Sequence, residues 1–147
     1  MIMDALCLLS DAQALTATAV STSSYDAGNV TPKVDIGPGE PLAVVITVDV
    51  AADATTGDET YQFDIITSAA AALTSPTVVA SRLIGRALLT AGRIIVFPIP
   101  MVEVPLRFWG LQYTLGGTTP TITVTASIMP LSFADQIKIY ARGYVIS

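Results

Sequence analysis

Histidine is absent from this chain of 147 residues, and its absence removes much of the side-chain chemistry on which enzymes rely. Without histidine there is no Ser-His-Asp or Cys-His catalysis, no histidine-ligated zinc and no histidine general acid–base step. The glycine patterns of Walker and Rossmann nucleotide-binding loops are also missing. A glycosidase needs two opposed carboxylates, but the acids here mostly stand beside Gly, Thr or Ala in loop-like sequence. We therefore expect no enzymatic activity and no cofactor.

Cysteine is almost absent as well, since Cys7 is the single one. One cysteine allows neither an intrachain disulfide nor a thiolate metal cluster, which suits a reducing cytoplasm. No basic residue stands beside Cys7 in the sequence to lower the pKa of its thiol. We interpret Cys7 as a small apolar contact rather than a reactive thiol.

Charge is scarce, because only 13% of the residues are charged while 52% are hydrophobic and the mean hydropathy is +0.63. A monomer of this composition has difficulty covering itself with polar surface. A membrane span is not the explanation, because the apolar run Leu42–Val48 ends at Asp49, and prolines and Glu103 interrupt residues 94–104. The N-terminus has too short an apolar core for a secretion signal, and no targeting segment is assigned. Burial by other protein, including copies of itself, is the expectation, so the chain is predicted to be a homo-oligomer.

The few charges are unevenly distributed along the chain. Residues 1–64 contain ten acids and one base, and residues 65–147 contain two acids and six bases. The net charge of −5 argues against direct binding to nucleic acid. The asymmetry either orients docking between subunits or onto an acidic partner, or simply reflects acids that solubilise loops.

The stretch Thr121–Met129 carries the clearest structural signal in the chain. Alternate residues are apolar on one side and hydroxyl-bearing on the other: Ile122, Val124, Ala126 and Ile128 against Thr121, Thr123, Thr125 and Ser127. A period of two predicts a strand with one face on a core. Hydroxyl groups on the other face keep a sheet soluble and yet allow it to lie against another protein at a low desolvation cost.

The same alternation recurs along the chain with turn residues between the segments. Further strands are predicted at Leu42–Val50, at 61–66, at Thr77–Leu83, at Arg93–Ile99 and at Leu106–Leu115. Prolines at 98, 100 and 105 place the end of the fourth of these at a sheet edge. Gly116-Gly117 is expected to turn Leu106–Leu115 into a hairpin with the Thr121 strand, and Ala69–Leu73 is either a helical turn or a loop. The prediction is an all-β fold, a jelly-roll-like antiparallel β-sandwich with little helix, formed as a single domain over residues 1–147.

Two groups of residues suggest binding chemistry. Oxygen ligands in the acidic loop 49–59 could hold Ca²⁺, but the spacing of Asp49, Asp53, Asp58 and Glu59 matches no EF-hand, and a solvated acidic loop between two strands is the preferred interpretation. No metal site is therefore predicted. Trp109 with Phe108 could form a sugar-stacking platform, but a Trp on a strand whose alternate residues are apolar more often belongs to a core or an interface.

Several segments resemble the jelly-roll capsid cement, or decoration, proteins of tailed bacteriophages. The matching stretches are Ser10–Ala14 followed by a Thr/Ala/Ser strand, Gly39–Ile46, Val48–Ala52, Gly57–Tyr61 and Tyr140–Tyr144. The middle of the chain, Ala69–Pro105, departs from the pattern and is richer in Ala, Ile and Pro. The resemblance implies a structural virion protein, made in the host cytoplasm, that binds the outer surface of an icosahedral capsid and bridges major capsid protein subunits.

A second function stays open from the sequence. A carbohydrate- or receptor-binding β-sandwich of a phage fibre or adhesin would use Trp109, Tyr113 or Tyr25 for sugar stacking and loop acids for Ca²⁺. Retention on a glycan column distinguishes it from a cement protein, which co-sediments with capsids.

The C-terminal residues 131–147 form either an extended arm or a strand of the protein's own sheet. They mix apolar and basic residues in an extended rather than helical pattern, and an apolar extended end can add to the edge of a neighbour's sheet. Dimers and trimers are both compatible with such an arm. The candidate interface residues are Arg107, Phe133, Ile139, Tyr140, Arg142 and Tyr144.

Overall fold

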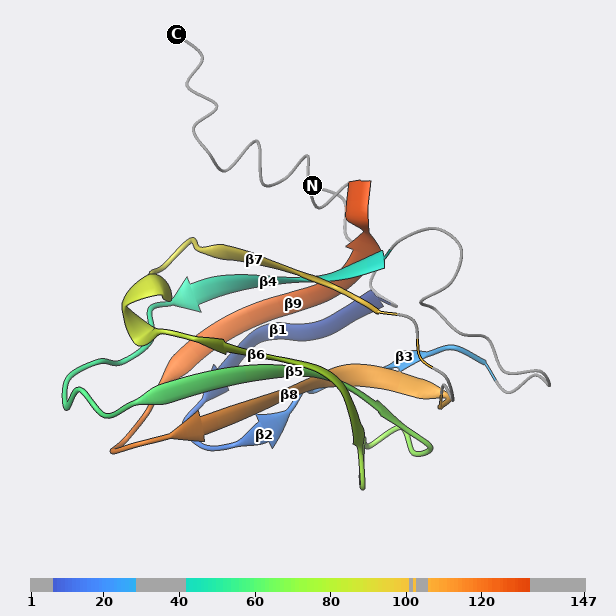
Figure 1. Cartoon of the computed structure of the whole chain (residues 1–147), viewed down its shortest axis with the longest axis horizontal. Coiled ribbons are helices and arrows are strands. Elements are labelled where there is room, and N and C mark those ends of the chain that lie inside the picture. Colours follow the sequence, from blue (N-terminus) through green and yellow to red (C-terminus); the bar gives the residue numbers. More distant parts are fainter. Residues whose placement is uncertain (1–6, 29–41, 101, 103–105, 133–147) are drawn as a thin grey trace, which may run out of the picture.

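Two antiparallel β-sheets pack face to face in the computed structural model, which describes residues 7–28, 42–100, 102 and 106–132 (Figure 1). The elements are β1 (Leu8–Leu15), β2 (Ala19–Val20), β3 (Tyr25–Asp26), β4 (Leu42–Val50), β5 (Thr60–Ser68), β6 (Thr77–Ile84), the 3₁₀-helix η2 (Arg86–Leu88), β7 (Ile94–Pro98), β8 (Phe108–Gly116) and β9 (Ile122–Pro130). No helix in this part of the chain is long and apolar enough to cross a membrane.

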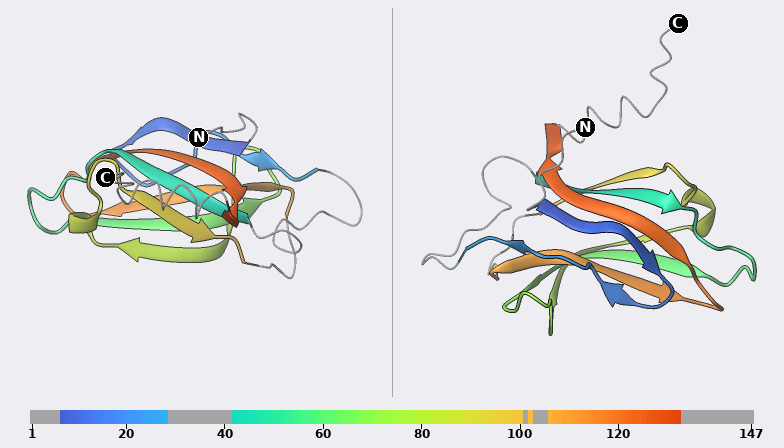
Figure 2. Two further views of the ribbon diagram at one scale, coloured as in Figure 1. Left: turned by 90° about the horizontal axis from the view of Figure 1, so that it is seen from above. Right: turned by 180° about the vertical axis from the view of Figure 1, so that it is seen from behind.

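The order of the strands is that of a jelly roll. One sheet runs β1-β9-β4-β7, and the other runs β2-β8-β5-β6 with β3 also paired to β8 (Figure 2). If β2 and β3 count as one interrupted strand, the eight described strands form two four-stranded sheets, and β5 and β6 are the one consecutive pair that lies in the same sheet, as in a jelly roll. The predicted jelly-roll-like sandwich is confirmed. We call the sheets the β9 sheet and the β8 sheet after their central strands.

The expected hairpin between Leu106–Leu115 and the Thr121 strand is wrong. β8 pairs with β5 from Thr60↔Gly116 to Ser68↔Phe108, while β9 pairs with β1 and β4 in the other sheet. A Gly-Gly turn permits a crossing between sheets as readily as a hairpin, because both need only positive φ and a sharp reversal. Since both strands have an apolar face, each gains more by packing across the core than by lying side by side.

The alternation predicted for the last strand is confirmed. Ile122, Val124, Ala126 and Ile128 belong to the core between the sheets. On the outer face Thr123 and Thr125 are half-buried and Ser127 is buried. The hydroxyl residues of β9 therefore point away from the core, in the middle of the β9 sheet.

Aromatic side chains fill the space between the sheets. The largest fully buried ones are Trp109, Tyr61, Tyr113 and Phe63. The rings of Phe63 and Tyr113 meet edge to face, with centroids 5.9 Å apart and planes at 89°. This arrangement places the positive edge of one ring on the negative face of the other.

The remaining predicted segments differ from the structure mainly at their ends. Strict alternation along Leu42–Val50 would place Val50 on the same inner face as Val48, but a bulge between the two turns Val50 outward, and it is 58% exposed. Ala69–Leu73 is a turn and not a helix, and Leu73 is buried with a φ of 57°. β7 ends its sheet, as its proline suggested. The short helix η2 was not predicted.

Candidate functional site

Of the six predicted interface residues, the structure describes Arg107 alone. Its Nε donates to Oδ1 of Asp26 and a terminal nitrogen donates to Oδ2, both at 2.8 Å. The guanidinium carbon lies 4.9 Å from the ring centroid of Phe108. The hydrogen bond from Arg107, together with one from the Gly28 amide, lowers the pKa of Asp26 to about 2. Arg107 therefore joins β3 to the start of β8 within its own chain, with about a third of its side chain exposed. Phe133, Ile139, Tyr140, Arg142 and Tyr144 lie outside the described residues, as does the rest of the proposed arm after Ser132.

The acids of loop 49–59 are used by hydrogen bonds within the protein. Asp49 accepts from the Thr125 hydroxyl, Asp53 from Thr55 and Asp58 from the amide and hydroxyl of Thr118. Their carboxylates thus point to different partners rather than to one ion. In the described ranges no group of three or more Asp, Glu, Cys or His side chains could hold a metal ion.

Glu59 is the exception among these acids, because its side chain is almost fully buried at 1% exposure. Its Oε1 accepts from the amide and hydroxyl of Thr56, its Oε2 accepts from the amide of Gly57, and Arg86 Nε lies 4.0 Å away. The Thr56 hydroxyl is the main reason that the pKa of Glu59 is lowered from 4.5 to about 2. The ionised form is therefore bound more tightly in the folded protein than in the unfolded chain.

This lowered pKa predicts that Glu59 contributes to acid stability. The contribution is complete above pH 4.5 and is lost as the pH falls towards about 2, because the unfolded chain takes up a proton first. The substitution Glu59→Gln should lower the urea midpoint at about pH 7 and have a smaller effect near about pH 3, where part of the contribution has been lost. Asp11→Asn, on an exposed part of β1, is the control. An equal loss for Glu59→Gln at both pH values would contradict the prediction.

The sugar-stacking platform finds little support in the positions of its aromatic residues. Trp109 and Tyr113 are buried at 1% and 0% exposure, which confirms Trp109 as a core residue. Phe108 is half-buried beneath Arg107, and Tyr25 is half-buried against the core. Cys7 also packs against the core, as expected of a small apolar contact.

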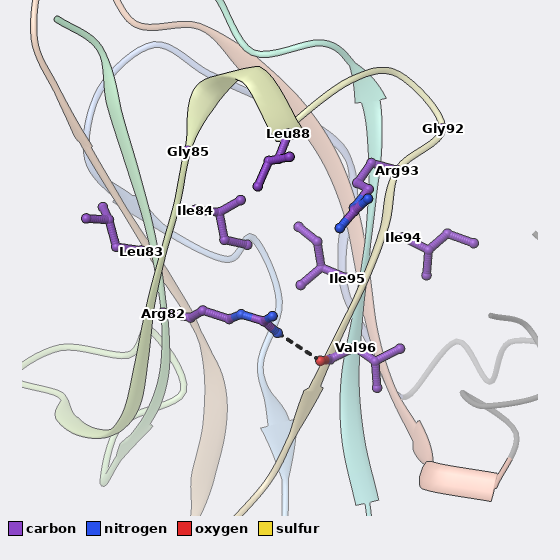
Figure 3. A pocket seen from close by; sticks show the side chains of 10 residues that line it. All are labelled: Arg82, Leu83, Ile84, Gly85, Leu88, Gly92, Arg93, Ile94, Ile95 and Val96. Carbon is purple, nitrogen blue, oxygen red and sulfur yellow. Dashed lines mark hydrogen bonds between the residues drawn. The ribbon is translucent and has the colours of Figure 1, made fainter. Parts of the chain in front are cut away.

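A groove lies between β6 and β7, the strands that end the two sheets (Figure 3). It has a volume of about 470 Å³. Its lining consists of Arg82, Leu83, Ile84, Gly85, Leu88, Gly92, Arg93, Ile94, Ile95 and Val96. We call it the flank groove. Among the described residues, one hydrogen bond crosses it, from Arg82 to the carbonyl of Val96 at 3.3 Å.

The opposite flank of the sandwich is closed by hydrogen bonds. Gln13 on β1 donates to the Val20 carbonyl at 3.0 Å and accepts from the Thr22 amide at 3.1 Å. The Ser23 amide donates to the Leu9 carbonyl, and the hydroxyls of Ser10 and Tyr113 lie 2.8 Å apart. Among the described residues, several hydrogen bonds thus join the two sheets along β1 and β2, whereas the bond from Arg82 to Val96 alone joins them along β6 and β7.

Sequence reasoning did not identify the flank groove. Its strands were predicted, but the meeting of β6 with β7 depends on the tertiary arrangement of both sheets. One signal was present, because Arg82 alternates with Ala80 and Ile84 and so interrupts the inner face of β6. A charge on the inner face of a strand is typical of an edge strand.

Comparison with known proteins supports one assignment. No curated protein matches this sequence. A solved structure titled "Structure of infectious bursal disease virus Gx strain" aligns over 81% of this chain and 26% of the viral chain, at 16% identity and a TM-score of 0.26. Neither a shared fold nor a shared function follows from similarity at that level. The model of the Bbp16 family matches residues 9–128, which span the sandwich from β1 to β9. The chain belongs to the Bbp16 family.

Proposed function

We propose that the protein is a structural component of a phage virion that binds the outer surface of the icosahedral capsid and bridges major capsid protein subunits. The observation that carries the proposal is the nearly uncharged outer face of the β9 sheet on a sandwich whose interior is filled by core side chains. Four of the five segments that resemble phage cement proteins lie within the jelly-roll part or directly before β4. The role requires contact surface and no catalysis.

The outer face of the β9 sheet has the chemistry of a protein contact. In register across three strands, Val45 lies beside Ser127 and Val96, and Thr47 lies beside Thr125 and Ile94. The small side chains of Ala43 and Val45 are buried, and they pack with Met129 and with the partly buried residues Ile94, Val96 and Leu131. Apolar and hydroxyl groups are desolvated at a low free-energy cost, so this face suits docking onto a shell.

The outer face of the β8 sheet differs in chemistry. Gln62 lies opposite Thr114, and Asp64 lies opposite Gln112. The Gln62 amide donates to the Asp64 carboxylate at 2.9 Å. Burying these amide and carboxylate groups costs more than burying methyl and hydroxyl groups. We therefore assign the capsid contact to the β9 sheet.

Stabilisation of the shell follows from mass action. A protein that binds the assembled shell and not its dissociated subunits stabilises each site by RT ln(1 + [L]/Kd). A shell offers many such sites, so modest affinities add up. In a co-sedimentation experiment, the purified protein should pellet with capsids that lack it and raise the temperature at which they disassemble. Failure to pellet at saturating concentration, with retention on a glycan column instead, would favour the carbohydrate-binding function.

Two matched substitutions test which face binds. Thr47→Lys and Thr114→Lys each place a charge on a half-buried mid-strand threonine, the first on the outer face of the β9 sheet and the second on that of the β8 sheet. Thr47→Lys should weaken capsid binding at least about tenfold, because an unpaired charge is desolvated at the contact. Thr114→Lys should leave binding unchanged in the same co-sedimentation assay. The reverse ranking would move the contact to the β8 sheet.

A homo-oligomer is part of the proposal, on the ground of the low charge and high apolar content of the chain. Sedimentation equilibrium of the purified protein at micromolar concentration should give a mass above that of one 15.3 kDa chain. A monomer across the whole concentration range would refute this part and leave the capsid role to single chains.

A further inference from the structure

We propose that the flank groove binds an extended acidic segment of another protein, which adds as a strand to the free edge of β7. The site lies at the free edge of β7, next to the outer face of the β9 sheet, and shares Ile94 and Val96 with it. Strand addition at this edge needs no capsid contact, so the proposal does not depend on the capsid role. Three features carry it: a free backbone edge, two arginines with no described carboxylate partner, and an apolar floor.

The free backbone edge follows from the hydrogen bonds of β7. The Val48 amide donates to the Arg93 carbonyl, and the Ile99 amide donates to the Leu42 carbonyl, so odd-numbered residues of this strand bond towards β4. Residues of an antiparallel strand alternate in the direction of their backbone groups, which turns Ile94 and Val96 towards the groove. The hydrogen bond from Arg82 to the Val96 carbonyl agrees with this orientation. An added strand would find a donor and an acceptor at Ile94 and a donor at Val96, whose carbonyl already accepts from Arg82.

The charge of the groove is entirely positive. Arg82 and Arg93 both line it, and its ten lining residues include no acid. Figure 3 shows the two guanidinium groups reaching from opposite strands into the space between them. Neither forms an ion pair with a described residue, whereas nearby Arg86 lies beside the buried carboxylate of Glu59. Two guanidinium groups on one groove favour carboxylates of an incoming chain.

The floor and rim of the groove are apolar. Ile84, Leu88 and Ile95 line it together with the two arginines. Leu88 is 55% exposed, so its side chain is accessible to a bound chain, and Ile95 extends the core into the groove. A bound strand would alternate apolar side chains towards this floor with acidic ones towards Arg82 and Arg93.

A second copy of this chain is a poorer occupant. Among the described residues, the acids near the ends of the sandwich are engaged, Asp26 by Arg107, Asp58 by Thr118 and Glu59 by Thr56. Using any of them in the groove would break bonds in the donor chain. The competing explanation for Arg82 and Arg93 is protection of two edge strands against aggregation, which requires no ligand.

The test is fluorescence anisotropy of the full-length protein with a labelled peptide of about six residues that alternates valine and glutamate. We expect saturable binding that weakens about tenfold in the double variant Arg82→Gln/Arg93→Gln, as two lost ion pairs predict. Arg93→Gln alone should weaken binding as well, and it removes no described side-chain hydrogen bond, so folding is a lesser concern. Arg93→Lys should restore most of the affinity, since it restores the charge.

Peptide controls separate strand addition from simple charge attraction. A peptide with lysine in place of glutamate should not bind, and one with N-methylated valines should lose binding, because it cannot donate to the edge of β7. Slower hydrogen exchange at the Ile94 and Val96 amides should accompany binding. The proposal is overturned if the arginine variants bind the peptide like the parent protein. It is equally overturned if those variants change only aggregation or the sedimentation mass, which would assign the arginines to edge protection or to a contact between copies.

Discussion

The substitution Trp109→Ala should lower the free energy of unfolding by ~3–5 kcal/mol, the range for truncating a large buried aromatic side chain. Trp109 lies on β8 opposite Tyr25 on one side and Thr67 on the other, and it is 1% exposed. Its removal would leave a cavity between the sheets that the surrounding side chains cannot fill, since protein interiors are close-packed. A two-state urea melt followed by circular dichroism measures the loss.

Trp109→Phe is the informative control for this substitution. The Nε1 group of Trp109 is buried and has no hydrogen-bond partner in the described structure. Phenylalanine removes that unsatisfied donor, which offsets part of the lost packing. We therefore expect a clearly smaller loss for phenylalanine than for alanine. An alanine variant that loses less than about 1 kcal/mol would mean that Trp109 is exposed, and the carbohydrate-binding function would gain support.

Gly117→Ala should be destabilising by about 3 kcal/mol, because the residue faces two obstacles at once. Its φ is +89°, in the region that favours glycine. A Cβ there would also lie 2.5 Å from the Asp58 carbonyl oxygen and 2.7 Å from the Glu59 Cα. These are backbone atoms of the β4–β5 loop, so a rotamer change cannot relieve the clash. The turn between β8 and β9 can approach that loop only with glycine at this position.

Gly92→Ala isolates the first of the two obstacles. Gly92 has a similar φ of +84°, but a Cβ there meets nothing within 4 Å. Its substitution should cost only the strain of the left-handed conformation, about 1–2 kcal/mol. The comparison is made by urea melts of both variants. Equal losses would show that the contact between Gly117 and the Asp58–Glu59 backbone does not restrict the turn.

Local periodicity was sufficient to predict the six strands from β4 to β9 and the faces of several of them, but it gave no bounds for β1 to β3. The side-chain alternation of β9 and the burial of Trp109, Leu111 and Tyr113 follow from a period of two, which depends only on residues adjacent in the sequence. Among these six strands the clear error, the hairpin after Leu115, concerns pairing rather than secondary structure. Every residue type except proline offers the same backbone hydrogen-bonding groups. The alternation of side chains in a strand therefore does not determine which other strand pairs with it.

Sequence by itself determined that this chain forms an antiparallel sandwich with few charges and no histidine chemistry, because composition and alternation are local properties. Tertiary structure decided which strands meet, through pairs as distant as Leu8↔Ser127 in β1 and β9. It also decided that Arg107 binds Asp26, whereas Arg82 and Arg93 face each other across a groove. All three arginines stand in strand-like sequence. Their environments differ because the residues that come to lie beside each arginine depend on the path of the whole chain between the two sheets.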